Sequence, residues 1–459
     1  MSSSLNTVTN QQEPIAAIAT AVGEAGIAVI RVSGSKALEK TTQIFTGNQL
    51  PEQKSHTIHY GSIKEDGRVI DDVLISVFKS PNSYTGEDTA EISCHGGALV
   101  TQTVLEALLR QGIRHAEPGE FTHRAFLNGK LELSQAEAVA DLIHARSGKA
   151  VESARRQLDG ALGEHIRQFR QQIIDATAMV ELELDFIEED VEFASRDELK
   201  KLLTDLETEI ETLLATYETG RLVKHGVRTV FVGQPNAGKS TLLNTLMGKD
   251  RAIVSATAGT TRDVIDADWS YDGLLFTLTD TAGLRITEDE IEAEGVKRSQ
   301  QAVNDADLVV FLHDLSDEDE QRRSQLESLL TIPEGKPVIR LGTKADLVEK
   351  SERPDLDMVI SSVQNEGIDE LKSMMKDRVA RDESIDTSGL MVTSTRHRDA
   401  LEKARHHVQE SLKALETGMT GDFLSIDLRS ALNHLGTITG EITTEDVLDS
   451  IFSRFCIGK

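Results

Sequence analysis

The sequence predicts three regions of different fold class: an α+β domain, an all-α helical domain, and an α/β domain inserted into the helical one. Short β-rich runs mix with helical stretches up to about residue 128, which is an α+β pattern. Apolar residues then recur every three or four positions, as in helices. From residue 227 short β-rich runs alternate with helical stretches, which indicates a mostly parallel sheet covered on both faces. Because helical periodicity returns after about residue 384, we expect domains at 1–128, at 129–221 together with 384–459, and at 222–383.

The individual elements follow from periodicity and turn residues. In the first region we expect a helix over 98–110 and strands over 15–19, 27–32, 73–78 and 90–93. In the helical region one apolar stripe runs from 158 to 187 and a second from 199 to 217, and later helices cover 401–415 and begin near 443. The acidic run at 181–192 is interpreted as a solvated helix end and loop rather than a metal site. In the inserted region we expect strands over 227–232, 274–279, 308–312 and 337–341.

Composition excludes several classes of protein. The chain has 459 residues, of which 39% are hydrophobic and 27% charged, as in soluble proteins of about two to four domains. No apolar run approaches the roughly 18 residues of a membrane span, and the polar start resembles neither a secretory signal nor a mitochondrial presequence. Two cysteines are too few for a disulfide framework. We therefore expect a cytoplasmic protein with no membrane partner and a frayed N-terminal tail.

The net charge of −28 argues against broad, non-specific binding to a phosphate backbone, because such binding needs many Lys and Arg residues. It leaves open a local basic patch or an RNA held partly by a partner. The acidity is also compatible with a salty habitat, and the sequence does not separate these explanations.

A phosphate-binding loop opens the inserted region. The run Gly233-Gln-Pro-Asn-Ala-Gly-Lys-Ser240 has the spacing G-x-x-x-x-G-K-[ST] and lies between a predicted strand and a helical stretch. Its glycines let backbone N–H groups close around phosphate oxygens at a helix N-terminus. We expect Lys239 to meet the β- and γ-phosphates and the Ser240 hydroxyl to bind Mg²⁺.

Two further segments follow in the order expected of a nucleotide hydrolase. Gly259-Thr-Thr-Arg-Asp263 offers Thr261 as a second hydroxyl ligand of Mg²⁺. Asp280-Thr-Ala-Gly283 ends a predicted strand, which would place Asp280 near the metal and the Gly283 N–H near the γ-phosphate. Together with the phosphate-binding loop, these segments predict a Ras-like α/β P-loop domain.

The segment Thr343-Lys-Ala-Asp346 indicates the base. The Asp346 carboxylate can accept hydrogen bonds from the ring N–H and the exocyclic amine of guanine, a donor pair that adenine lacks. The stem of Lys344 can cover the base, and a backbone N–H in Ser361-Ser-Val363 can meet the guanine oxygen. GTPases usually carry Asn where Thr343 stands, a departure that we expect to affect affinity more than guanine preference.

The group that orients the attacking water is not evident from these motifs. Leu284 stands where Ras-like proteins carry a glutamine, and leucine cannot orient water. Most of the acidic residues that follow are expected to be solvated loop charges, but one of them could take this role: Glu288, Asp289, Glu290, Glu292 or Glu294.

Distinctive segments also lie outside the nucleotide motifs: Tyr84-Thr-Gly-Glu-Asp88, His95-Gly-Gly97, Pro118-Gly-Glu-Phe-Thr122, Arg124-Ala-Phe-Leu-Asn128, Gln135-Ala-Glu-Ala-Val139-Ala-Asp-Leu-Ile143 and Cys456-Ile-Gly-Lys459. With the GTPase motifs they make the chain resemble, over nearly its whole length, the tRNA-modification GTPase family called MnmE or TrmE.

The resemblance implies a homodimer with an N-terminal folate-binding and dimerisation domain, a helical domain and an inserted G domain. With a flavoprotein partner, MnmG (also called GidA), such proteins form a heterotetramer or larger complex that acts on tRNA. The complex adds a carboxymethylaminomethyl- or aminomethyl-type group at C5 of the wobble uridine (U34) of certain tRNAs. A tetrahydrofolate derivative (5-formyl- or 5,10-methylene-THF) is the one-carbon source. GTP hydrolysis follows pairing of two G domains and uses K⁺ where other GTPases use an arginine finger.

The resemblance also assigns residues of the nucleotide site. Asn236 matches the K⁺ ligand, and Glu292 matches the acid that helps to position water, so Glu292 and Lys239 are the expected catalytic residues. The loop that supports K⁺ contributes Ser255, Thr257 and Thr260. The whole expected GTP-binding set is Asn236, Ala237, Gly238, Lys239, Ser240, Thr241, Ser255, Ala256, Thr257, Ala258, Gly259, Thr260, Thr261, Asp280, Thr281, Ala282, Gly283, Thr343, Lys344, Ala345, Asp346, Ser361 and Ser362.

For the folate, four residues match the binding positions of the family: Arg31, Glu91, Lys130 and Lys459. A carboxylate such as Glu91 can accept the paired N–H donors of a pterin edge, and cations suit the glutamate tail.

The two cysteines have open roles. Cys456 is either a small buried apolar residue on the closing helix or a thiolate that assists chemistry at uridine, with a pKa lowered by Arg454 and Lys459. Cys94 beside His95 is interpreted as part of a Gly-rich turn, since two ligands do not make a metal site.

Two other function classes stay open. A ribosome-assembly GTPase of the Era or Der type would act as a binding switch, but it would predict a basic RNA-binding domain next to the G domain. A stress regulator would affect tRNA only indirectly.

Overall fold

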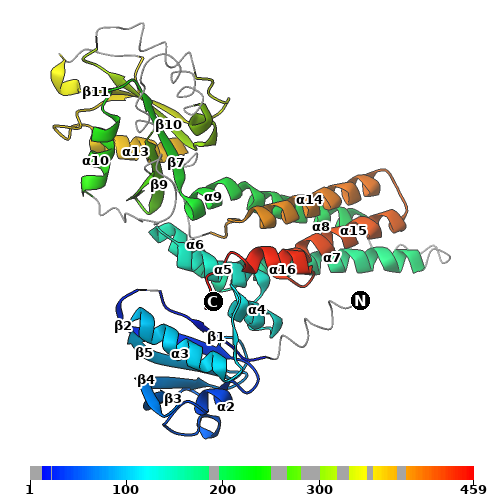
Figure 1. Ribbon diagram of the computed structural model, residues 1–459. Coiled ribbons are helices and arrows are strands. Elements are labelled where there is room, and N and C mark those ends of the chain that lie inside the picture. Colours follow the sequence, from blue (N-terminus) through cyan, green and yellow to red (C-terminus); the bar gives the residue numbers. More distant parts are fainter. Residues whose placement is uncertain are drawn as a thin grey trace. The chain divides into compact units, whose positions relative to one another are not determined.

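The computed structural model describes residues 13–21, 23–185, 196–249, 266–280, 300–317, 330–348, 355–379 and 389–459 (Figure 1). The chain divides into two compact units. The first comprises residues 1–140, 157–203 and 406–459, and the second comprises residues 141–156 and 204–405. The three domain boundaries expected from the sequence stay a prediction.

The first unit contains a six-stranded sheet of order β3-β4-β5-β2-β1-β6. Its strands are β1 (Ile15–Ile18), β2 (Ala25–Ser33), β3 (Thr57–Glu65), β4 (Arg68–Phe78), β5 (Thr89–Gly96) and β6 (Arg114–His115). Only the β1–β6 pair is parallel, and the other neighbours are antiparallel. The strands predicted over 15–19, 27–32, 73–78 and 90–93 are confirmed as β1, β2, β4 and β5.

One face of this sheet carries the apolar core. Ile30 and Val32 of β2 are fully buried there together with Ile75 of β4 and Ile92 of β5. Helix α3 (Ala98–Arg110) covers this face with Val104, Leu105, Ala107 and Leu108, and the short elements α2 (Ala37–Thr42) and η1 (Leu50–Glu52) complete the cover. The helix has the bounds that the sequence predicts. The opposite face of β2 carries Arg31 and Ser33, because side chains alternate along a strand.

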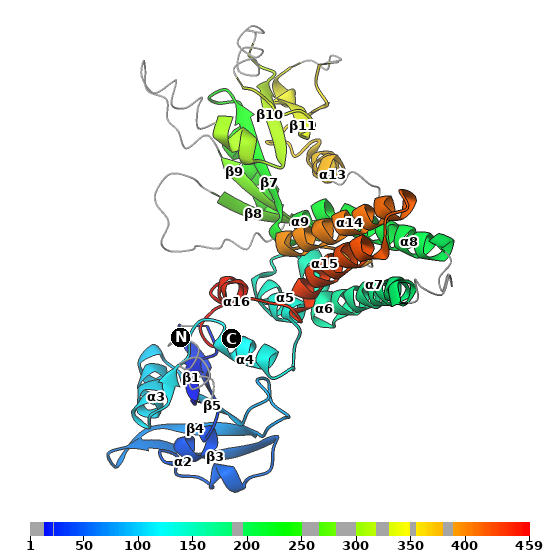
Figure 2. The same ribbon diagram turned by 90° about the vertical axis from the view of Figure 1, so that its right-hand side faces the viewer.

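The helical elements are α4 (Glu120–Leu127), α5 (Leu133–His144), α6 (Gly148–Leu158), α7 (Ala161–Asp185), α8 (Arg196–Ala215), α9 (Tyr217–His225), α14 (Thr395–Glu416), α15 (Gly421–Thr439) and α16 (Glu445–Phe452). Within the first unit α7 packs along α15. Figure 2 shows these two helices lying side by side, as Figure 1 does.

Two helix boundaries predicted from the apolar stripes are wrong. Leu158 ends α6, and α7 begins only at Ala161, because Gly160 has a φ of +91° and its N–H bonds the Gln157 carbonyl. Tyr217 likewise begins α9 and does not end α8. The helix predicted near 443 is confirmed as α16, with Thr444 as its N-cap residue, although no side chain caps it. Residues 1–12 and 186–195, which include the predicted tail and much of the acidic run, lie outside the described residues.

The second unit contains a six-stranded sheet of order β12-β11-β10-β7-β9-β8. Its strands are β7 (Val227–Gly233), β8 (Asp266–Tyr271), β9 (Leu274–Asp280), β10 (Leu308–Asp314), β11 (Val338–Thr343) and β12 (Met358–Val359). All neighbours are parallel except β8 and β9. The mostly parallel sheet and its four predicted strands are therefore confirmed.

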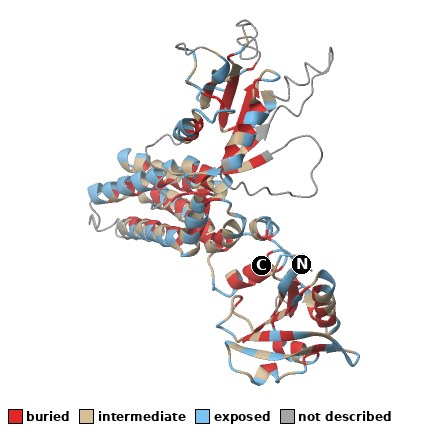
Figure 3. Ribbon diagram, turned by 90° about the vertical axis from the view of Figure 1, so that its left-hand side faces the viewer, coloured by how far each residue is buried: buried red, intermediate tan, exposed pale blue. Residues whose placement is uncertain are grey.

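Helices α10 (Lys239–Lys249) and α13 (Ile368–Val379) pack on one face of this sheet, where Trp269 and Phe276 are fully buried. Val303 and Leu330 belong to a second apolar cluster with Val230 and Phe311, whose side chains alternate with those of the first cluster along β7 and β10. Figure 3 shows the buried residues running along these strands. In the described part of the chain, no helix is long and apolar enough to cross a membrane.

Candidate functional site

The phosphate-binding loop joins the end of β7 to the start of α10. Asn236 and Gly238 both have positive φ angles, +67° and +89°, so the loop curls tightly, and glycine supplies the second position without strain. The ammonium of Lys239 lies inside the curl. Its Nζ donates to the carbonyls of Gly233 at 2.6 Å and of Gln234 at 2.8 Å, and the residue is only 7% exposed. A buried cation at a helix N-terminus is an arrangement that suits a phosphate group.

Thr343 ties this loop to the end of β11. Its hydroxyl donates to the Ala237 carbonyl at 2.8 Å and lies 3.2 Å from the His313 carbonyl, and the side chain is buried. Residues 237 and 343 are far apart in the sequence, but β7, β10 and β11 are consecutive in the sheet. The threonine that stands in place of the usual asparagine therefore supports the phosphate-binding loop directly.

The predicted guanine-binding residues gather beside Thr343. The buried Ser361 hydroxyl donates to Asp346 Oδ1 at 2.6 Å, and the Ala345 N–H bonds the Ile360 carbonyl at 3.1 Å. The exposed Asp346 carboxylate is thereby oriented by a buried serine while staying open to a base. Ser362 lies close to α10, because its carbonyl accepts a hydrogen bond from Thr245 at 3.4 Å.

Lys344 is held by an acidic residue that the sequence motifs did not single out. Its Nζ lies 2.5 Å from Asp314 Oδ2 at the end of β10. Partial burial would raise the pKa of Asp314, but hydrogen bonds from Lys344 and Ser316 outweigh it, so the pKa lies below its ordinary value. The Asp314 carboxylate therefore stays charged and fixes the lysine stem beside Asp346. In the sequence, this role of Asp314 is indicated only by its position at the end of a predicted strand.

Several predicted residues of the nucleotide site lie outside the described residues: Ser255, Ala256, Thr257, Ala258, Gly259, Thr260, Thr261, Thr281, Ala282, Gly283, Leu284 and Glu292, with the other acidic candidates Glu288, Asp289, Glu290 and Glu294. Asp280 is the last residue of β9, and its backbone pairs with Phe231, two residues before Gly233. It therefore lies at the same end of the sheet as the phosphate-binding loop.

A second polar cluster lies on the face of the first sheet opposite its apolar core. Arg31 and Glu91 are directly paired across β2 and β5, and Arg31 Nε donates to Glu91 Oε1 at 2.9 Å. The guanidinium lies 5.0 Å from the Tyr84 ring centre and 5.6 Å from that of Phe121. Its Nη1 is buried and has no hydrogen-bond partner among the described residues. A buried donor of this kind can donate to an acceptor atom of a bound ligand.

The C-terminus brings Lys459 to this cluster. The Phe121 N–H donates to the Lys459 carbonyl at 3.2 Å. Gly458 has a φ of +99°, and a Cβ there would lie 2.2 Å from the Ile18 carbonyl oxygen, so only glycine allows this close approach. Burial lowers the pKa of Lys459, the charge of Arg31 lowers it further, and Glu91 opposes both. Of the four predicted folate residues, the structure thus brings together Arg31, Glu91 and Lys459.

The remaining sequence candidates lie elsewhere or differ from expectation. Lys130 is exposed and donates to the Pro81 carbonyl at 3.1 Å. Cys456 is exposed, so its interpretation as a buried apolar residue is wrong: it follows α16 and faces solvent. Cys94 is buried, whereas the neighbouring His95 is exposed and pairs with Asp71 at 2.7 Å.

The docked C-terminal segment also covers a histidine. His123 of α4 stacks on Phe452 of α16, with ring centres 4.7 Å apart, and its Nε2 is buried without a partner among the described residues. Burial lowers the pKa of His123 below its ordinary value of 6.5, Arg124 acts in the same direction, and Glu120 and Asp449 oppose the shift. Packing on Phe452 therefore favours the neutral form of the ring.

A phosphate-binding loop, a carboxylate oriented for a base and a mostly parallel sheet with both at its carboxyl end define a P-loop GTPase domain. Two family models match the chain: "GTP-binding protein TrmE N-terminus" over residues 14–130 and "MnmE helical domain" over residues 133–456. The chain belongs to the MnmE (TrmE) family of tRNA modification GTPases, as its motifs predict.

Named relatives agree over the whole chain. The tRNA modification GTPase MnmE of Salinibacter ruber is 47% identical over 460 residues, which cover 98% of this chain and 100% of that protein. The MnmE protein of Cytophaga hutchinsonii is 44% identical over 462 residues, which cover 99% and 100%.

Solved structures give weaker matches. Era of Aquifex aeolicus bound to GDP and aluminium fluoride is 24% identical over 39% of this chain and 66% of its own, with a TM-score of 0.28. The G domain of the T. maritima FeoB transporter is 26% identical over 33% and 98%, with a TM-score of 0.26.

Proposed function

We propose that this chain is the GTP-hydrolysing component of a complex that modifies C5 of the wobble uridine (U34) of certain tRNAs. It works as a homodimer with the flavoprotein MnmG (GidA) and uses a one-carbon unit of tetrahydrofolate to add an aminomethyl- or carboxymethylaminomethyl-type group. The observation that carries the proposal is the Arg31–Glu91–Lys459 cluster in a chain that also carries a GTPase domain. A ribosome-assembly switch has no use for such a cluster. The relatives named as tRNA modification GTPases support the same assignment.

The nucleotide site fits GTP with Mg²⁺. Lys239 already lies buried within the loop that would close around the phosphates, and Asp346 is held by Ser361 with its carboxylate exposed. Ser240 and Thr261 would hold Mg²⁺, which neutralises charge on the β- and γ-phosphates. When GTP binds, the Lys239 ammonium would exchange its hydrogen bonds to the two loop carbonyls for hydrogen bonds to phosphate oxygens, because an ammonium forms stronger hydrogen bonds with a charged acceptor than with a neutral one.

K⁺ stimulation belongs to the same proposal. Asn236 is exposed and has a left-handed backbone conformation in the loop, and its side-chain oxygen is of the kind that can serve as a K⁺ ligand. Carbonyls of Ser255, Thr257 and Thr260 would complete the ion site, and Glu292 would position the water. Turnover is expected to rise with K⁺, little with Na⁺, and to increase per molecule with protein concentration as G domains pair. Asn236→Ala should lose the K⁺ response and retain nucleotide binding. Equal wild-type rates in K⁺ and Na⁺, or a K⁺ response that survives in Asn236→Ala, would contradict this.

The charged side chains of the proposed folate site are chemically complementary to folate. A pterin edge offers paired N–H donors, which the Glu91 carboxylate can accept. The anionic tail suits the unpaired Arg31 Nη1 and the ammonium of Lys459. Lys130, whose Nζ donates to the Pro81 carbonyl, is the fourth residue proposed to contact the folate. Bound folate would supply the one-carbon unit, while these residues bind and orient it.

Nucleoside mass spectrometry tests the proposed function. tRNA from cells that lack this gene should have lost C5-modified wobble uridines, and the gene on a plasmid should restore them. Unchanged wobble uridines in the deletion strain would sink the proposal and favour a binding switch.

A further inference from the structure

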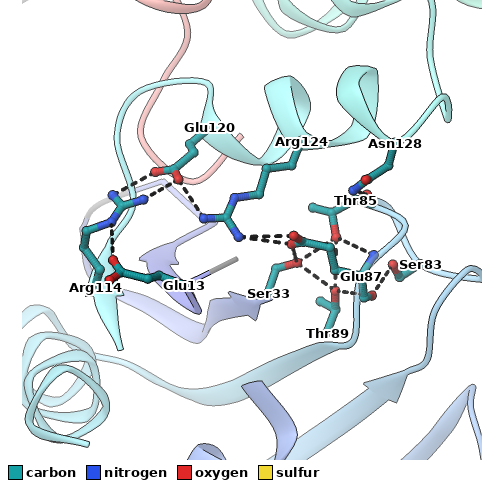
Figure 4. A network of polar contacts seen from close by, with 10 residues as sticks. All are labelled: Glu13, Ser33, Ser83, Thr85, Glu87, Thr89, Arg114, Glu120, Arg124 and Asn128. Carbon is teal, nitrogen blue, oxygen red and sulfur yellow. Dashed lines mark hydrogen bonds and ion pairs between the residues drawn. The ribbon is translucent and has the colours of Figure 1, made fainter. Parts of the chain in front are cut away.

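A buried polar network joins helix α4 to the loop that precedes β5 (Figure 4). Its centre is Arg124, which is only 3% exposed. Nη1 of Arg124 donates to both carboxylate oxygens of Glu87, at 3.2 and 3.3 Å, and Nη2 donates to Glu120 Oε1 at 2.9 Å. One guanidinium thus connects two carboxylates that lie 33 residues apart in the sequence.

The loop end of this network is fastened at several points. The Ser33 hydroxyl of β2 donates to Glu87 Oε2 at 2.8 Å and lies 2.6 Å from the Thr85 hydroxyl. Asn128, at the end of α4, donates to the Thr85 carbonyl at 2.8 Å. The Ser83 hydroxyl bonds the Glu87 carbonyl at 2.5 Å. Residues 83–87 are therefore fixed both to β2 and to α4.

At the helix end, the network reaches a second arginine. Glu120 accepts two hydrogen bonds from Arg114, at 2.5 and 3.0 Å, in addition to that from Arg124. Burial would raise the pKa of Glu120, but these partners and the Glu117 N–H lower it overall. The carboxylate is charged and holds the first turn of α4 in place.

The segments that the network fixes are those that carry the rings around Arg31. Tyr84 precedes Thr85, and its hydroxyl lies 2.8 Å from that of Thr122. Phe121 stands between Glu120 and Thr122, and its N–H holds the Lys459 carbonyl. Arg31 lies two residues before Ser33 on the same side of β2. The network therefore adjoins the Arg31–Glu91–Lys459 cluster without sharing any of its residues.

The stability of the sheet has a different source. The large apolar cluster lies on the opposite face, where Ile30 and Val32 are fully buried, and no member of the network belongs to it. Aliphatic burial of that size holds a domain together without an ion network, and buried ion pairs are weak contributors to stability. What Arg124 fixes is therefore the pair of segments beside Arg31, and not the apolar core of the sheet.

We propose that Arg124 is a positioning residue of the folate site: by joining Glu87 to Glu120 it holds Tyr84, Phe121 and the docked Lys459 in place around Arg31. This inference rests on the proposed function, since it assumes that the cluster binds folate. Arg124 itself does not touch the ligand.

The test is Arg124→Lys in the full chain. A lysine retains the charge but donates from one point, so it can bond one of the two carboxylates and not both. The expected loss of affinity for 5-formyl-tetrahydrofolate is about tenfold or more, as for a lost hydrogen bond between charged groups, while GTP affinity stays unchanged. Arg110→Lys is the matched control, because Arg110 also pairs with two glutamates, Glu65 and Glu106, but on an exposed surface.

A second readout needs no folate. In a protein produced with Lys459 as its last residue, carboxypeptidase B removes this lysine, and intact mass gives the rate of its removal from the native protein. Trimming of Lys459 should be several-fold faster in Arg124→Lys than in the wild type or in Arg110→Lys. Ile30→Val, which lowers stability from the apolar face, should leave both folate affinity and trimming unchanged. Should Arg124→Lys fail to fold, Glu87→Gln, which keeps the shape and removes one charge, takes its place with the same expected directions.

The outcomes separate the two proposals. A wild-type chain that binds no folate overturns the proposed folate site, and the trimming rates then still decide whether Arg124 positions Lys459. A wild-type chain that binds folate, with Arg124→Lys binding as tightly and trimmed as slowly, overturns the positioning role. Equal losses in Ile30→Val also overturn it, because general destabilisation would then explain the result.

Discussion

Replacing Thr343 by valine tests how the nucleotide site is supported. Valine has nearly the shape of threonine but no hydroxyl, so the substitution removes the hydrogen bond to the Ala237 carbonyl and the longer one to the His313 carbonyl. The site is 3% exposed, and water cannot readily replace the lost donor. The phosphate-binding loop then loses its tie to β11.

The expected magnitude follows from the two bonds. A buried hydrogen bond contributes about 1 kcal/mol net, and an acceptor left unpaired in the interior costs about 1–3 kcal/mol. Thr343→Val should therefore lower the free energy of unfolding of the second unit by about 1–3 kcal/mol. The share that bears on the loop, about 1–1.5 kcal/mol, corresponds to a fall in nucleotide affinity of about five- to tenfold.

Fluorescent GDP titration and urea unfolding measure these two quantities. Thr343→Ser keeps the hydroxyl and should bind nearly as the wild type. Thr229→Val is the matched control, because Thr229 is as deeply buried in β7 and, among the described residues, its hydroxyl donates to its own strand, to the Val227 carbonyl at 3.4 Å. If Thr343→Val binds nucleotide no more weakly than Thr229→Val, the hydroxyl does not support the loop and the reasoning fails.

Three further predictions concern the base, the C-terminus and pH. Asp346→Asn should weaken GTP binding and improve binding of xanthosine nucleotides, because xanthine has a carbonyl where guanine has its amine; a variant that still prefers GTP in competition titrations would contradict the assignment. Deletion of residues 456–459 should abolish folate binding and tRNA modification while GTP affinity stays intact. Cys456→Ser should reduce folate affinity only slightly. If the thiol is catalytic, Cys456→Ser should lose tRNA modification as fully as the deletion does. The pKa of His123 is lower in the folded state, where the ring is buried and stacked on Phe452, so the folded state binds fewer protons than the unfolded state and stability should fall as pH drops below 6.5. Thermal unfolding measured from pH 8 to pH 5 checks this. If the unfolding temperature of His123→Phe falls with pH as steeply as that of the wild type, the prediction is refuted.

Much of the fold was predictable from local patterns. The helix Ala98–Arg110 has the predicted bounds because its apolar period is strong and Gly97 and Gly112 flank it. Four strands were not predicted: β3, β6, β8 and β12. Strands β6 and β12 have only two residues each, and β3 has a single buried residue. The break at Gly160 was missed because the apolar steps run on across it, from Leu158 to Leu162.

The two sites differ in how far the sequence could predict them. The phosphate-binding loop is a contiguous motif whose spacing carries its chemistry, whereas the contact of Thr343 with Ala237 depends on strand order. The Arg31–Glu91 pair depends on the register of β2 and β5, and Lys459 reaches it from the other end of the chain. Such a cluster has no local pattern, so only the family resemblance predicted it.

The most direct test of the central claim is reconstitution. The purified chain, its flavoprotein partner, unmodified tRNA, GTP, K⁺ and 5,10-methylene-tetrahydrofolate are combined with an amine donor, and tRNA nucleosides are analysed by mass spectrometry. The account predicts a C5-modified wobble uridine in the complete mixture and none when this chain, GTP or the folate is omitted. Full modification with GDP in place of GTP, or without folate, would contradict it.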